Sequence, residues 1–151
     1  MEKELDILLK SRKLILKIVD PMTLDQINKI PQGHRNTIGW NLAHLVVTQQ
    51  LLCYINSGQK SILSKEFIDT YKKGSKTERP ISEEELVYIK EQLLQCVLQT
   101  IADYQENKFG AYNAYETSVG IVLGNIEDAL KFNNFHEGIH LGTILAQRKM
   151  V

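Results

Sequence analysis

The sequence has few of the residues that interrupt helices or form disulfides. Only three of its 151 residues are proline, Pro21, Pro31 and Pro80, and only nine are glycine. Its two cysteines, Cys53 and Cys96, do not form a C-x-x-C pair. We expect both to be buried as small apolar side chains, and we expect the protein to work in the reducing cytoplasm.

The sequence also lacks an excess of charge and any long apolar run. The 18 basic residues balance the 18 acidic ones, which argues against binding to nucleic acid, where a basic face is typical. No apolar run approaches the roughly 18 residues that cross a bilayer, and the acidic N-terminal stretch MEKELDILLK is unlike a signal peptide. With 43% hydrophobic residues, residues 1–151 are expected to form one soluble domain with a single core.

Apolar residues recur at helical spacing in the first third of the chain. From Lys3 to Val19 they follow a 3.6-residue period, and Pro21 is expected to end that helix. Asn36 is a good N-cap for a second helix, which we expect to continue to about residue 56, with Gly58 as its stop signal.

The rest of the sequence predicts two further long helices. Residues 59–81 are polar, with one short helix expected at 65–71. Ser82 and the glutamates that follow it predict a capping box and a third helix to about residue 107. The segment 109–124 is rich in tyrosine and glycine and is expected to be irregular. Asn125 is expected to cap the last helix, whose final turn carries Arg148 and Lys149.

Four long helices in a chain of this length indicate an all-α fold, a four-helix bundle. The connection of about 25 residues between the second and third helices is too long for a tight antiparallel turn. Such a crossover favours two parallel helices and an up-down-down-up order.

The last helix carries two histidines, His136 and His140, within the stretch NNFHEGIHLGTILAQRK. Residues four apart lie only ~40° apart around a helix and ~6 Å along it, so both side chains point to one side and can bind one metal ion. His44, among apolar residues of the second helix, is the best candidate for a third ligand. Three neutral imidazoles suit zinc, nickel or another divalent metal and leave room for water or a substrate. The alternative is that each histidine is a hydrogen-bonded core residue.

The other polar residues near these histidines have both a functional and a plain interpretation. Trp40 precedes His44 by one turn. It is interpreted either as a wall of the site or as a residue of the hydrophobic core. Asn133 and Thr143 bracket the histidine pair, either orienting a water or an imidazole or standing as polar residues at the bundle edge. Glu137 lies ~100° around the helix from His136 and is expected to be solvated.

Other candidates are less suited to the site. His34 is expected in a solvated loop. Cys53, nine residues after His44, is expected on the opposite face of its helix and is no ligand. Tyr112 and Tyr115 are interpreted either as lining a substrate entrance or as packing over the open end of the bundle.

The ordered motifs NTIGWNLAHL and HEGIHLGTILAQR resemble those of the DinB-like superfamily, which includes the YfiT-type proteins described as metal-dependent hydrolases. The resemblance spans essentially the whole chain. The residues that match the family pattern in order are Asn36, Trp40, His44, His136, His140, Gly142 and Arg148.

The resemblance implies an often dimeric four-helix bundle in which His44, His136 and His140 hold a divalent metal. Better understood members of the family transfer or isomerise groups with bacillithiol, mycothiol or glutathione. The resemblance thus favours a thiol-dependent transferase that uses a low-molecular-weight thiol and a small-molecule substrate. The alternatives are a metal-dependent hydrolase and a metal-binding or purely structural bundle without catalysis. Thr143 stands where the family commonly has glutamine. Because this position lies on the face of the histidines, the resemblance does not identify the substrate.

Overall fold

The computed structural model describes all residues, Met1–Val151, and the all-α prediction is confirmed. The only strands form a small two-stranded sheet. No helix combines the length and the apolar character that crossing a membrane requires. In chain order the elements are α1 (Glu2–Val19), α2 (Leu24–Asn28), α3 (Ile38–Gln49), η1 (Gln50–Tyr54), η2 (Ile55–Ser57), α4 (Lys65–Tyr71), α5 (Glu83–Gln105), β1 (Tyr115–Glu116), β2 (Val122–Leu123) and α6 (Ile126–Gln147).

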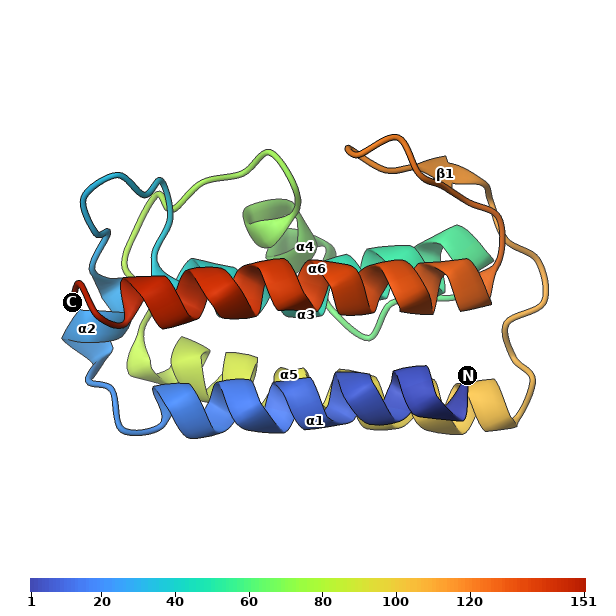
Figure 1. The fold of residues 1–151 in the computed structure, drawn as a ribbon, viewed down its shortest axis with the longest axis horizontal. Helices are drawn as coiled ribbons and strands as arrows, with labels where there is room; N and C mark the ends of the chain where they lie inside the picture. The colour runs from blue at the N-terminus through green and yellow to red at the C-terminus, as the bar shows by residue number, and fades with distance from the viewer.

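The four long helices pack against one another in a closed cycle. Helix α1 contacts α5 and α6, and α3 also contacts α5 and α6. Figure 1 looks onto α1 and α6, with α5 behind α1 and α3 behind α6. The larger of two apolar clusters lies among α1, α3 and α5, and the smaller one lies near the hairpin of β1 and β2.

The helix ends follow local capping chemistry, with two corrections to the sequence-based expectations. Thr37, not Asn36, is the N-cap of α3, because its hydroxyl accepts a hydrogen bond from Trp40 N. Ser82 caps α5 as expected, but Glu85 binds Arg79 instead of closing a capping box.

The long second helix predicted to run to residue 56 is interrupted. Helix α3 ends at Gln49 and is followed by a π-helical turn, η1, and a 3₁₀ turn, η2. Gly58 ends the run in the left-handed conformation, with φ of 70°, as expected for a glycine after a helix. π turns are rare overall but occur often at functional sites, and this one begins six residues after His44.

Two short elements were not predicted. Thr23 and Gln26 form a full capping box at the start of α2, for which the T-x-x-Q spacing was the available signal. In the segment predicted to be irregular, Tyr115 pairs with Leu123 in an antiparallel hairpin. The short helix α4 has the expected bounds, and Asn125 caps α6 as expected.

Candidate metal centre

Helices α3 and α6 bring the three predicted histidines together. The ring centroids of His136 and His140 lie 4.4 Å apart, and that of His44 lies 5.1 Å from the first and 4.9 Å from the second. One nitrogen from each ring lies within 4.8 Å of the other two. The spacing on α6 was visible in the sequence, but only the packing of α3 on α6 adds His44.

His44 is held from two sides. Its ring stacks on Trp40, with centroids 4.5 Å apart and an angle of 14° between the planes. Its Nδ1 lies 2.6 Å from the carbonyl oxygen of Tyr71 at the end of α4. Because a carbonyl only accepts hydrogen bonds, Nδ1 carries the proton and Nε2 keeps its lone pair, which is the form that binds a metal.

His140 is oriented by a chain of amides that links α6 to α3. Its Nδ1 lies 2.8 Å from Asn41 Oδ1. The Asn41 amide nitrogen donates to Thr37 O and to Gln147 Oε1, and Gln147 in turn donates to Asn36 O. These bonds fix Oδ1 as the acceptor, so the lone pair of His140 also resides on Nε2.

His136 is the least constrained of the three rings. Its buried Nδ1 has no hydrogen-bond partner, which is unusual for a buried polar atom. Burial first, and then the neighbouring histidines and Arg12, lower the pKa of His136 to about 2. A nitrogen that is buried, uncharged and unpartnered beside two other imidazoles fits a metal ligand.

The other two histidines are also disfavoured as cations. Burial, with a smaller contribution from His44, lowers the pKa of His140 to about 4. Burial lowers the pKa of His44, and the bond to Tyr71 O opposes this. Three neutral imidazoles thus face one point, which is the donor set that zinc, nickel and related divalent ions take from proteins.

The histidines open onto a cavity of about 400 Å³. Leu51, Leu52 and Phe132 form its apolar wall. Lys73 is its only charged lining residue, and Lys73 forms no ion pair in the structure. The remaining polar lining residues are Thr48, Asn56, Tyr115, Thr117 and Ser118. A cavity that combines an apolar wall with convergent polar groups is typical of a small-molecule site.

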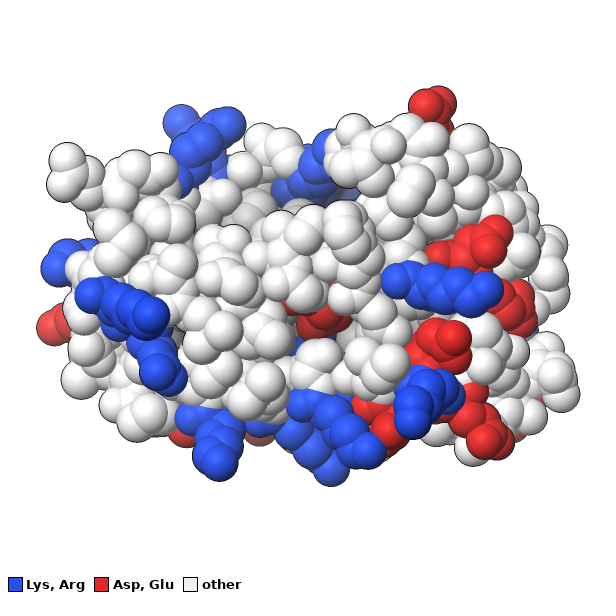
Figure 2. Space-filling view, in the orientation of Figure 1, with Lys and Arg blue, Asp and Glu red and all other residues white.

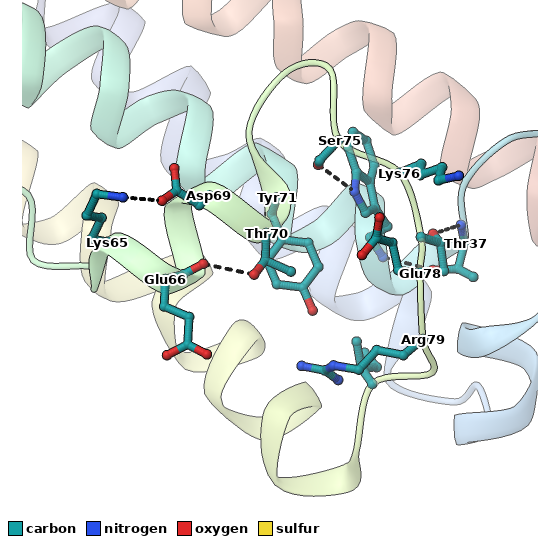
Figure 3. Close-up of a pocket in the computed structure, with 13 residues that line it drawn as sticks. Thr37, Lys65, Glu66, Asp69, Thr70, Tyr71, Ser75, Lys76, Glu78 and Arg79 are labelled. Atoms are coloured by element: carbon teal, nitrogen blue, oxygen red, sulfur yellow. Dashed lines mark hydrogen bonds and ion pairs between the residues drawn. The ribbon is translucent and has the colours of Figure 1, made fainter.

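A larger groove, of about 940 Å³, lies beside the centre and not over it. Figure 3 shows this groove between α4 and the segment 72–81. Some of its charges pair locally, Lys65 with Asp69 and Arg79 with Glu85. Trp40, whose indole N–H donates to Ser75 Oγ, lines the groove and separates it from His44.

The other residues singled out in the sequence have different surroundings. Thr143 donates to Ile139 O within α6, and Asn133 is fully buried with both amide atoms unpartnered. Neither has a hydrogen bond to the histidines, so a role in orienting a ligand stays a prediction for both. Tyr115 lines the cavity, while Tyr112 donates to Leu52 O.

Glu137 is not solvated, contrary to the expectation. It is 1% exposed and forms an ion pair with Arg12, which is 0% exposed. The expectation considered α6 alone and missed that the face of Glu137 packs against α1. Asn41 was also missed, although it is a polar residue three positions before His44. Gln147, two turns after His140, lies on the histidine face of its helix, but no role was predicted for it.

The packed helices and the three convergent histidines indicate a helical protein with a candidate metal-binding site. The family model of the DinB superfamily matches residues 7–144, and the chain belongs to this superfamily. A search of curated proteins found no significant match.

Proposed function

We propose that the protein is a metal-dependent enzyme that uses a low-molecular-weight thiol, most simply as a transferase. The observation that carries the proposal is the cluster of neutral His44, His136 and His140, which lines a ligand-sized cavity. Zinc and nickel are the ions we favour. We take the chain to be an up-down-down-up four-helix bundle. In support, Gln49 bonds to Cys96 and Tyr54 bonds to Asp103, as expected if α3 and its continuation run parallel to α5.

A bound divalent ion would supply positive charge that lowers the pKa of a thiol. The three histidines would hold it, while Tyr71 O and Asn41 fix the ring orientations. Leu51, Leu52 and Phe132 exclude water from one wall of the cavity.

The cavity lining leaves activation of the nucleophile to a bound cation. It includes no aspartate or glutamate, so neither a thiol nor a water would have a carboxylate base. A bound cation would lower the pKa of either nucleophile, and the thiol is preferred here because its sulfur is the stronger nucleophile once deprotonated. Lys73, the only charge on the lining, would bind a carboxylate of the thiol or of its co-substrate.

The test is conjugation of bacillithiol, mycothiol and glutathione to an electrophile such as monochlorobimane, with zinc- or nickel-loaded protein and with chelated protein. We expect metal-dependent conjugation with at least one thiol. Metal-dependent cleavage of ester or amide substrates without thiol turnover would support the hydrolase instead. Metal binding without either activity would support a non-catalytic metal-binding bundle.

We also propose a cytoplasmic homodimer without nucleic-acid or membrane partners. The surface of α1 and α6 exposes Ile7, Leu14, Phe135 and Ile139, and Figure 2 shows that the middle of this face is mainly uncharged. An exposed apolar patch of this kind is typical of an interface. Light scattering on the purified protein measures the oligomeric state, and a monomer at all concentrations would contradict the dimer.

A further inference from the structure

Arg12 and Glu137 form an ion pair in the middle of the helical core. Their side chains are 0% and 1% exposed. Arg12 Nε donates to Glu137 Oε2 at 2.7 Å, and one terminal nitrogen donates to Oε1 at 2.5 Å. Two parallel bonds of this kind define the relative position of both side chains.

The rest of the guanidinium contacts the two other long helices. The same terminal nitrogen donates to Leu45 O at 3.0 Å, and the second one approaches Leu93 O at 3.4 Å. One side chain on α1 therefore bonds to α3, α5 and α6. Leu45 directly follows His44, and Glu137 directly follows His136.

This arrangement is not explained by stability alone. Ion pairs in a protein interior stabilise little or not at all relative to apolar residues of the same volume, because both charges lose their hydration. What a fully bonded pair provides is a defined geometry, since any displacement leaves a charge unpaired.

Binding of one metal ion by all three histidines requires a defined position of α3 relative to α6. His136 and His140 share one helix, so their spacing is set locally, but His44 comes from another helix. Metal–nitrogen distances tolerate only about 0.2 Å, whereas one residue of slip along a helix is about 1.5 Å. The relative position of α3 and α6 therefore decides whether three nitrogens can bind one ion.

We propose that the Arg12–Glu137 pair is the positioning element that fixes α3 against α6 and thereby sets the geometry of the three histidines. The inference rests on the proposed metal binding. A second link between the same helices, from Asn41 to His140 and Gln147, lies on the other side of His44 along α3. His44 is thus held between two polar links.

The test replaces both charges at once, in the variant Arg12→Met, Glu137→Met, so that no charge is left buried. The control is Lys90→Gln, Asp20→Asn, which removes an ion pair from α5 to the end of α1 without touching α3 or α6. Zinc affinity is measured by competition with a chromophoric chelator, and the ligand geometry by the visible spectrum of bound Co²⁺. Circular dichroism reports folding.

We expect a folded double variant with at least ~10-fold weaker zinc binding, as for changes in groups that support ligands, and with altered Co²⁺ bands. The control should match the wild type. Wild-type affinity and spectrum in the folded double variant would overturn the inference while leaving the metal site standing. A wild-type protein that binds no metal would instead overturn the proposed function and, with it, this inference.

If the double variant does not fold, the single variant Arg12→Lys tests the positioning role instead. Lysine keeps the charge but lacks the planar fork, so we expect a folded protein with weaker zinc binding and shifted Co²⁺ bands. An unchanged affinity and spectrum in Arg12→Lys would overturn the inference.

Discussion

At the scale of single residues, the candidate centre consists of three histidines, two of which are oriented by hydrogen bonds from Nδ1. His44 and His140 each donate from Nδ1 to a protein acceptor, so the lone pair of each ring lies on Nε2. In His44 this Nε2 accepts a hydrogen bond of 3.3 Å from Thr48 Oγ1. Burial disfavours the cationic form of both rings. The same environment that would be costly for a structural histidine prepares a metal ligand.

Replacing His44 by leucine separates a metal ligand from a core residue. Without metal, we expect the free energy of unfolding to change by no more than about 1–2 kcal/mol, because the loss is the hydrogen bond to Tyr71 O and a longer one from Thr48 Oγ1. With zinc, the wild type should gain the stabilisation that a bound ligand gives, and His44→Leu should not. Thermal unfolding with and without zinc measures both. Equal zinc stabilisation in the variant would show that His44 is not a ligand.

The metal-free protein should lose stability as the pH falls below 6.5. The pKa values of His136 and His140 are lowered from 6.5 to about 2 and about 4, so below pH 6.5 the unfolded chain binds protons that the folded chain does not. This stability is present above pH 6.5 and is lost as the pH falls toward the folded pKa values, by up to about 1.4 kcal/mol per pH unit for each histidine.

Urea unfolding of metal-free protein between pH 7 and 5 measures this loss. The variant His136→Ala, His140→Ala should show a shallower pH dependence over the same range, and His34→Gln, outside the cluster, should behave as the wild type. An identical slope in the double variant would contradict the account of the buried rings.

Asn41 should matter for metal affinity although it is no ligand. Asn41→Leu removes the acceptor for His140 Nδ1 and the partner of Gln147, and we expect about 10–100-fold weaker zinc binding. Asn41→Asp keeps the acceptor oxygen and should recover part of the affinity. Competition with a chromophoric chelator measures both, and wild-type affinity in Asn41→Leu would show that this link is dispensable.

At the scale of elements, periodicity predicted the long helices and failed where another interaction decided the outcome. The bounds of α1, α4 and α6 follow from apolar spacing and caps. The π turn after α3 and the hairpin of β1 and β2 have no periodic apolar pattern in the sequence from which they could be predicted. Asn36 was mistaken for a cap because its side chain accepts from Thr77 N, a tertiary contact that the local sequence does not contain.

The segment after α4 is expected to set ligand preference without affecting the metal. Lys73 lines the cavity of the histidines, whereas Lys76 lines the outer groove. Lys73→Glu should therefore weaken the apparent affinity for an anionic thiol, raising its KM by about tenfold, and leave zinc affinity unchanged. Lys76→Glu is the matched control and should leave KM unchanged. Equal effects of the two variants would indicate a general charge effect and not a ligand contact.

At the scale of the whole molecule, the site arises where segments distant in sequence meet. The pair on α6 could be predicted from spacing, because both histidines lie on one helix. His44 was inferred from the bundle and from the resemblance. Arg12, 125 residues from Glu137, could not be linked to the site from sequence, since nothing local shows which face of α1 meets which face of α6.

The most direct test of the central claim is the metal content of the purified, tag-free protein by inductively coupled plasma mass spectrometry. The comparison is the variant His136→Ala, His140→Ala, which retains His44 but loses both histidines of α6. The account predicts about one divalent ion per chain in the wild type, after purification or after incubation with zinc, nickel or manganese, and none in the variant. No ion in either protein would contradict the metal centre and leave the three histidines as core residues.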